Sequence, residues 1–262
     1  MKYFDSHAHY FDERFESECD VGVDNLIDAL LSESVSGIIN VGTSPMTSRL
    51  AIEQAKRHSG MYTAVGIHPS DSQYLDMSLE DALSDILSLI KTPESKCVCL
   101  GEIGLDYHYP DTDKECQTSY FREQMALAKE LDIPVCIHDR EAHGDVLDVI
   151  REFPGVRGVL HSYSGSYEMA RELISRGYMI SFSGTLTFTN AKKVREVAIR
   201  LPKESVLIET DAPYLAPHPN RGKLNHSGYL EYTARALAEL LNLSEDECAA
   251  LTEENARRFF GI

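Results

Sequence analysis

The feature that most constrains the fold is a regular alternation of short apolar segments with helix-forming segments. The apolar segments are rich in β-branched residues, as buried strands are. Eight of them have the length and composition of strands: Tyr3–Ser6, Gly37–Val41, Tyr62–Gly66, Cys97–Gly101, Pro134–His138, Gly158–His161, Tyr178–Phe182 and Val206–Glu209. Such alternation is typical of α/β proteins with a parallel sheet.

The segments between the expected strands carry the period of amphipathic helices. Apolar residues recur at helical spacing over 79–89, 121–131, 142–150 and 169–174, and Ser78 and Asp81 are placed to cap the first of these helices. Two more helices are expected at the end of the chain, over Tyr229–Leu241 and from Ser244 to about Phe260. Ser244 and Glu247 match a capping box. We expect one of these last helices to close the sheet into a barrel.

Eight strand–helix units in 262 residues predict an α/β fold, a single-domain (β/α)8 barrel of the TIM type over residues 1–262. No linker or low-complexity tract divides the chain. An open doubly wound sheet is the alternative, but it would need a Gly-rich turn after the first strand, where His7-Ala8-His9 stands. The hydrophobic content of 43% and charged content of 26% exclude a disordered or fibrous chain.

Composition also limits the location and the partners. No apolar run approaches the roughly 18 residues of a membrane span, and Met1–His7 lacks an apolar signal segment. We therefore expect a cytoplasmic protein with no membrane partner and no obligate protein partner. The six cysteines show no C-x-x-C spacing and are expected to be reduced thiols.

The net charge of −17 repels phosphate backbones at long range. It argues against a non-specific nucleic-acid scaffold. It leaves open an enzyme that holds phosphates through bound cations, because metal ions reverse the sign of the charge locally.

The strongest functional signal lies at the carboxyl ends of the expected strands. In a (β/α)8 barrel these ends share one face, and that face carries the active site. Six of the ends bear histidines or carboxylates: His7, His9, His68, Glu102, His138, His161, Glu209 and Asp211. Five of the 10 histidines of the chain fall at these ends. This joint placement predicts a metal site.

The residue types suit two divalent ions. His7 and His9 stand two apart in a strand, so they face the same side and can bind one ion. His138 and His161 offer nitrogen ligands to a second ion. Two ions close together would clamp a scissile group and activate a water molecule. The ligands leave the identity of the metal open among Mg, Mn and Zn.

Two carboxylates would complete this site. Glu102 can bridge two cations with its two oxygens, and Asp211 can hold a metal and accept a proton from water. Taken alone, each has an ordinary alternative: Glu102 could cap a helix, and Asp211 could be a turn residue before Ala212-Pro213.

Motifs in order along essentially the whole chain resemble those of the TatD-type metal-dependent deoxyribonucleases, a branch of the amidohydrolase superfamily. They are Asp5–His9, Val65–Pro69, Gly101–Tyr107, His138–Ala142, Leu160–Ser166, Ile180–Gly184, Glu209–Leu215, Arg221–Asn225 and Asn255–Phe259. The resemblance implies a barrel with a binuclear site. His7, His9 and Asp211 would hold one ion, His138 and His161 the other, and Glu102 would bridge. Ala8, Ser162 and Tyr163 depart from the family pattern without removing a ligand.

Further residues near the strand ends are candidates for substrate contacts: His68, Arg140, Glu209, Arg221 and Lys223. His68 could bind a phosphate or hydrogen-bond to a loop. The cations Arg140, Arg221 and Lys223 could grip phosphates or be solvated surface charges. Glu209 could contact substrate or orient metal ligands. Tyr107 and Tyr163 could stack bases or pack at the barrel rim.

These signals predict a hydrolase that cuts phosphodiester bonds of DNA by metal-activated water, with Asp211 as the base and Glu102 between the ions. A deep site admits a strand end more easily than an intact duplex, so we expect 3′–5′ exonuclease action on single-stranded or frayed ends. One alternative is an ester or amide hydrolase, such as an aminoacyl-tRNA deacylase or a lactonase. Another is a non-catalytic metal-binding protein, which the intact ligand set disfavours.

Overall fold

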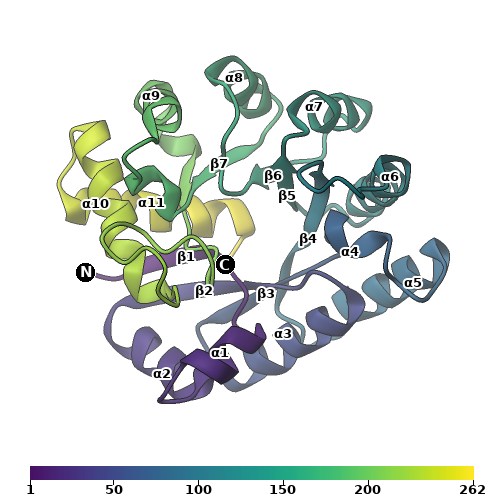
Figure 1. Ribbon diagram of the computed structural model, residues 1–262, viewed down its shortest axis with the longest axis horizontal. Helices are drawn as coiled ribbons and strands as arrows, with labels where there is room; N and C mark the ends of the chain where they lie inside the picture. Colours follow the sequence, from purple (N-terminus) through teal and green to yellow (C-terminus); the bar gives the residue numbers. More distant parts are fainter.

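The computed structural model describes residues 1–262 and contains the predicted barrel (Figure 1). One sheet of eight parallel strands runs in chain order from β1 to β8. The strands are β1 (Tyr3–Ala8), β2 (Val35–Val41), β3 (Met61–Val65), β4 (Cys97–Asp106), β5 (Val135–Arg140), β6 (Gly158–Leu160), β7 (Met179–Phe182) and β8 (Val206–Ile208). The fold is a single (β/α)8 domain of the TIM type.

Helices connect the strands and surround the sheet (Figure 1). They are α1 (Glu13–Glu18), α2 (Val23–Glu33), α3 (Pro45–Arg57), α4 (Pro69–Ser72), α5 (Leu79–Ile90), α6 (Lys114–Leu131), α7 (His143–Glu152), α8 (Tyr167–Ser175), α9 (Lys192–Arg200), α10 (Leu230–Leu241) and α11 (Glu245–Phe260). Short 3₁₀ turns are η1 (Gly184–Thr187), η2 (Lys203–Ser205) and η3 (Ser227–Tyr229). No helix is long and apolar enough to cross a membrane.

The first and last strands meet through their carboxyl-terminal extensions. The amide of His9 donates to the carbonyl of Ala212 at 2.7 Å, and the amide of Asp211 donates to the carbonyl of His7 at 2.9 Å. These two hydrogen bonds are formed by the backbone of the candidate site residues themselves. Closure of the barrel therefore places His7, His9 and Asp211 side by side.

The C-terminal helix α11 packs against both β1 and β8, as expected for the closing helix. It contributes Ala256, Phe259 and Phe260 to a cluster with inward-facing strand residues such as Phe4 and Leu207. A larger cluster fills the space between the strands and the helices around β4–β8. The end of the barrel opposite the carboxyl ends is thus closed by apolar packing, so the polar residues have one open face.

The element boundaries follow local sequence signals. Ser78 caps α5 by accepting from the amide of Asp81, and Ser244 with Glu247 forms the capping box of α11. The main difference is β4, which continues to Asp106, beyond the expected end at Gly101. A carboxylate such as that of Asp106 is unusual in a buried strand. Here its side chain faces His138 at the open end of the barrel. All six cysteines are free thiols.

Candidate metal centre

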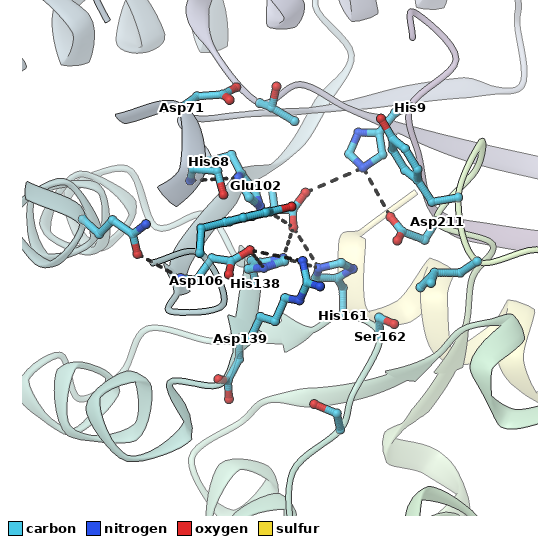
Figure 2. Close-up of a pocket in the computed structure, with 18 of the residues that line it drawn as sticks. His9, His68, Asp71, Glu102, Asp106, His138, Asp139, His161, Ser162 and Asp211 are labelled. Atoms are coloured by element: carbon cyan, nitrogen blue, oxygen red, sulfur yellow. Dashed lines mark hydrogen bonds and ion pairs between the residues drawn. The ribbon is translucent and has the colours of Figure 1, made fainter. Parts of the chain in front are cut away.

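The six predicted metal ligands come together at the carboxyl ends of the strands. Figure 2 labels all of them except His7. His7 and His9 lie at the end of β1 and just after it, Glu102 lies in β4 and His138 in β5. His161 directly follows β6, and Asp211 lies three residues after the end of β8. The side chains of His7 and Glu102 are almost fully buried. Glu102, His9, His138, His161 and Asp211 line a cavity of about 910 Å³.

One cluster is formed by His7, His9 and Asp211. The Nε2 atoms of His7 and His9 are 3.1 Å apart. Asp211 Oδ1 lies 3.7 Å from Nε2 of His7 and 3.4 Å from Nε2 of His9. Four donors placed about 2.1 Å from a tetrahedral ion would be about 3.4 Å from one another. The donor atoms of this cluster are therefore spaced as one divalent ion requires.

A second cluster surrounds the other side of Glu102. Glu102 Oε1 lies 2.8 Å from Nδ1 of His138 and 2.8 Å from Nε2 of His161. These two nitrogens are 3.1 Å apart. The other oxygen, Oε2, faces the first cluster at 3.4 Å from Nε2 of His7. Because its two oxygens point to different clusters, Glu102 is placed to bridge two ions.

The ring nitrogens that face away from the clusters have partners of their own. His9 Nδ1 lies 2.6 Å from the carbonyl of Val41, and His138 Nε2 lies 3.1 Å from Asp106 Oδ2. His161 Nδ1 lies 3.3 Å from Glu209 Oε1. Carbonyl and carboxylate oxygens only accept, so these nitrogens donate and the opposite ring nitrogen keeps its lone pair for a metal.

Glu209 lies behind His161, away from the cavity. It is fully buried, and its Oε1 accepts a hydrogen bond from the amide of Ser162 at 2.7 Å, while Oε2 has no partner. This position fits the orienting role considered for Glu209 and does not fit a substrate contact.

Two neighbours of the ligands were missed by sequence reasoning. Asp106 holds His138, and Cys136 Sγ lies 3.3 Å from Nδ1 of His7. The alternation of Glu102, Gly104 and Asp106 within β4 could have revealed Asp106, because residues two apart in a strand share a face. No sequence signal pointed to Cys136.

Electrostatics keep the two carboxyl ligands ionised. Burial by itself would raise the pKa of Glu102, but the charges of His161, His68 and His7 outweigh it and hold the pKa well below the usual value. Burial likewise opposes ionisation of Asp211, but the hydrogen bond with His9 and the neighbouring histidines lower its pKa. Ionised carboxylates are the form that binds metal ions.

The backbone has special conformations beside the ligands. Gly104 has φ +133°, and a Cβ at this position would overlap the carbonyl oxygen of His138. Only glycine therefore lets β4 approach β5 closely enough for Glu102 to reach His138. Asp211 has φ +58°, a left-handed conformation that aspartate tolerates better than most residues.

The candidate substrate residues fall into two groups. His68 and Arg140 line the cavity. His68 Nε2 lies 3.5 Å from Glu102 Oε1, so it joins the second cluster. Arg140 Nη1 lies 3.9 Å from Asp106 Oδ2. Arg221 and Lys223 are exposed and lie outside the residues that line the cavity.

The two tyrosines considered for stacking are held by hydrogen bonds. The Tyr163 side chain is buried, with its hydroxyl donating to the carbonyl of Ser166, and the Tyr107 hydroxyl donates to Asp145. Tyr163 still lines the cavity, whereas Tyr107 lies outside the lining residues. Tyr74, Tyr109 and Tyr214 also line the cavity and are 69%, 50% and 45% exposed.

A (β/α)8 barrel with two histidine–carboxylate clusters at the carboxyl ends of its strands defines a class, the metal-dependent hydrolases. The family model described as TatD related DNase matches residues 4–261. The chain therefore belongs to the TatD family and is a metal-dependent hydrolase of that family.

Several relatives match along their whole length. The chain is 40% identical to the "uncharacterized metal-dependent hydrolase YabD" of Bacillus subtilis, over 99% of each chain. It is 35% identical to the "uncharacterized metal-dependent hydrolase TatD" of Mycobacterium tuberculosis, over 98% of this chain and 97% of the relative. The crystal structure of YjjV, a TatD homologue from Escherichia coli, superimposes with a TM-score of 0.88 at 29% identity, covering 99% and 98% of the two chains.

Proposed function

We propose that the protein hydrolyses phosphodiester bonds of single-stranded DNA from the 3′ end with two divalent ions. The observation that carries the proposal is the position of Glu102, whose two oxygens face two separate sets of nitrogen ligands. Two divalent ions held there would polarise the phosphodiester and supply an activated water. The membership of a family described as related to a DNase supports the choice of substrate.

Each ligand has a definite task in this proposal. His7, His9 and Asp211 would hold one ion, and His138 and His161 would hold the other, with Glu102 between them. Asp211 Oδ1 faces Nε2 of His7 and His9, and the lowered pKa of Asp211 keeps its carboxylate ionised. It is therefore placed to accept a proton from the attacking water.

The cavity wall makes binding of phosphate dependent on the ions. The carboxylates in the wall include Asp71, Asp106, Asp111 and Asp139, while Arg140 is the guanidinium among the lining residues. Without cations this wall repels a phosphate group. We propose that Arg140 and His68 contact the phosphate beside the reacting one, because both line the cavity next to the second cluster.

The depth of the ligands favours a strand end. Glu102 lines the cavity and is only 3% exposed, and its neighbour His7 is fully buried. A phosphodiester in the middle of a duplex is flanked on both sides by paired backbone, and the duplex is too wide to enter the cavity. A single terminal nucleotide can enter, with its base beside the exposed Tyr74 or Tyr109.

A gel assay with a single-stranded DNA oligonucleotide labelled at its 5′ end tests this function. With Mg²⁺ or Mn²⁺, the protein should yield a ladder that shortens from the 3′ end. EDTA and the Glu102→Gln variant should abolish it, while Asp111→Asn, a change in the outer cavity wall, should retain it. An intact oligonucleotide in the presence of metal-loaded protein would contradict the proposal.

A second candidate is hydrolysis of an ester such as an aminoacyl-tRNA. The acidic cavity wall favours it, since Asp71 and Asp111 suit a substrate that carries an ammonium group. Release of free amino acid from aminoacyl-tRNA, together with an intact DNA oligonucleotide in the parallel assay, would select this function.

A further inference from the structure

A group of cations lies on one side of the cavity mouth. Lys192, Lys193 and Arg195 begin α9, and Arg221 and Lys223 belong to the segment after β8. We call these five residues the basic rim. The segments that carry them follow the carboxyl ends of β7 and β8, so they lie on the same face of the barrel as the metal centre.

Contacts between the two segments hold the basic rim together. The guanidinium carbon of Arg221 lies 4.2 Å from the ring centroid of Phe188, just before α9. The amide of His218 donates to Thr187 Oγ1 at 2.7 Å. The rim is therefore one surface, although its two parts are separated along the chain.

The cations of the basic rim are not neutralised by neighbours. Their hydrogen bonds go to neutral groups: Lys193 Nζ donates to the carbonyl of Ser164, Arg195 Nε to the carbonyl of Leu186, and Lys223 Nζ to Asn220 Oδ1. None of the five forms an ion pair with a carboxylate, although Glu196 lies on α9 as well. Elsewhere Arg14, Arg49 and Arg122 are paired with carboxylates. A surplus of positive charge thus collects here in a chain with net charge −17.

The basic rim is continuous with the cavity. Ser164, which accepts from Lys193, lines the cavity, and so do Val194 of α9 and Leu215 of the segment after β8. The opposite part of the wall carries Asp71 and Asp111. The mouth is therefore positive on the side of β7 and β8 and negative on the side of α4. A polyanion that enters the cavity is repelled by one side and attracted by the other.

We propose that the basic rim is the track for the backbone of the DNA strand on the 5′ side of the terminal nucleotide. The strand leaves the metal centre past Ser164 and Val194 and crosses the start of α9, where its phosphates contact Lys192 and Lys193. Arg195 and Arg221, anchored by Leu186 and Phe188, hold the strand between the two segments. This assignment rests on the proposed nuclease function, and it adds the direction in which the substrate lies.

The test compares two double variants with the same change in net charge. Lys192→Glu/Lys193→Glu alters the basic rim. Lys91→Glu/Lys129→Glu alters exposed lysines that end α5 and precede β5, at the opposite end of the barrel. All four lysines are exposed, so circular dichroism and thermal unfolding should match those of the parent protein.

Binding is measured by fluorescence anisotropy with a 12-nucleotide strand of thymidylate, blocked against cleavage by 3′ phosphorothioates, in the presence of Mn²⁺. We expect the rim variant to bind at least tenfold more weakly and the control variant to change less than twofold. The slope of log Kd against log salt concentration should be smaller by about 1.4 in the rim variant than in the parent, because each lost phosphate contact removes about 0.7. Equal losses in the two variants would overturn the assignment.

A small substrate separates the rim from the proposed function. The p-nitrophenyl ester of thymidine 5′-phosphate has no flanking backbone, so both variants should hydrolyse it at the parent rate. Hydrolysis of this ester without rim-dependent binding of the strand would overturn the track alone. Rim-dependent binding with no hydrolysis of ester or strand would support the track and overturn the nuclease.

Discussion

Asp106 Oδ2 lies 3.1 Å from Nε2 of His138, on the ring edge opposite the nitrogen that faces Glu102. The two residues belong to adjacent strands, and both side chains are largely buried. A carboxylate in this position fixes the tautomer and the orientation of a histidine ligand and increases its basicity.

The Asp106→Asn variant is expected to bind a metal ion at the second cluster 10- to 100-fold more weakly, because the amide is a poorer acceptor for the His138 ring. Isothermal titration of the metal-free protein with Mn²⁺ or Zn²⁺ measures it. The Asp111→Asn variant serves as the control because it removes a carboxylate of the same cavity wall that has no histidine partner. Unchanged affinity in the Asp106 variant would mean that the side chain does not support the ligand.

Removal of metal ions from the two clusters that share Glu102 should lower the stability of the folded protein. An ion present at 100 times its Kd stabilises the folded state by about 2.7 kcal/mol. EDTA should therefore lower the Tm of the parent protein by several degrees. In the Glu102→Gln variant EDTA should have little further effect, because both clusters have lost their shared ligand. A drop in Tm of the same size in both proteins would argue against a bridging Glu102.

The Gly104→Ala variant should lose both stability and metal. Its φ of +133° is unfavourable for alanine, and the added Cβ would overlap the carbonyl of His138. We expect a loss of at least about 2 kcal/mol in the free energy of unfolding. Urea unfolding and metal analysis after dialysis measure the two effects.

Gly144→Ala is the matched control for that substitution. Gly144 lies in α7, and a Cβ there meets no atom within 4 Å. Alanine in a helix is favoured over glycine by about 0.5–1 kcal/mol. The control should therefore equal or exceed the parent in stability, and a comparable loss in both variants would show that the close approach of β4 and β5 is not the cause.

Asp5 is expected to be essential for barrel closure. It is fully buried in β1 and accepts hydrogen bonds from Thr210 N, Thr210 Oγ1 and Ser227 Oγ. Asp5→Ala leaves these buried donors without an acceptor, which costs about 1–3 kcal/mol for each group that finds no other partner. Urea unfolding should place this variant at least about 2 kcal/mol below the parent. Asp5→Asn keeps one carbonyl acceptor and should lose less, and an alanine variant within error of the parent would contradict this role.

The architecture and the types of candidate ligand could be predicted from the sequence alone. Strands can be identified in runs such as Gly37–Val41 and Pro134–His138, because short apolar segments rich in β-branched residues are typical of buried strands. Once eight strands alternate with helices, parallel topology brings all their carboxyl ends to one face. His7, His9, Glu102, His138, His161 and Asp211 could then be grouped without knowing any distance between them.

The residues that contact and surround these candidate ligands could not be predicted from the sequence. The pairing of Asp106 with His138, and of Glu209 with His161, depends on the stagger between neighbouring strands and on the bend that follows each of them. The basic rim depends on the path of the segment after β8, which brings Arg221 onto Phe188. Local propensities do not encode such contacts, because they join residues far apart in the chain whose distances are set by the packing of the whole barrel.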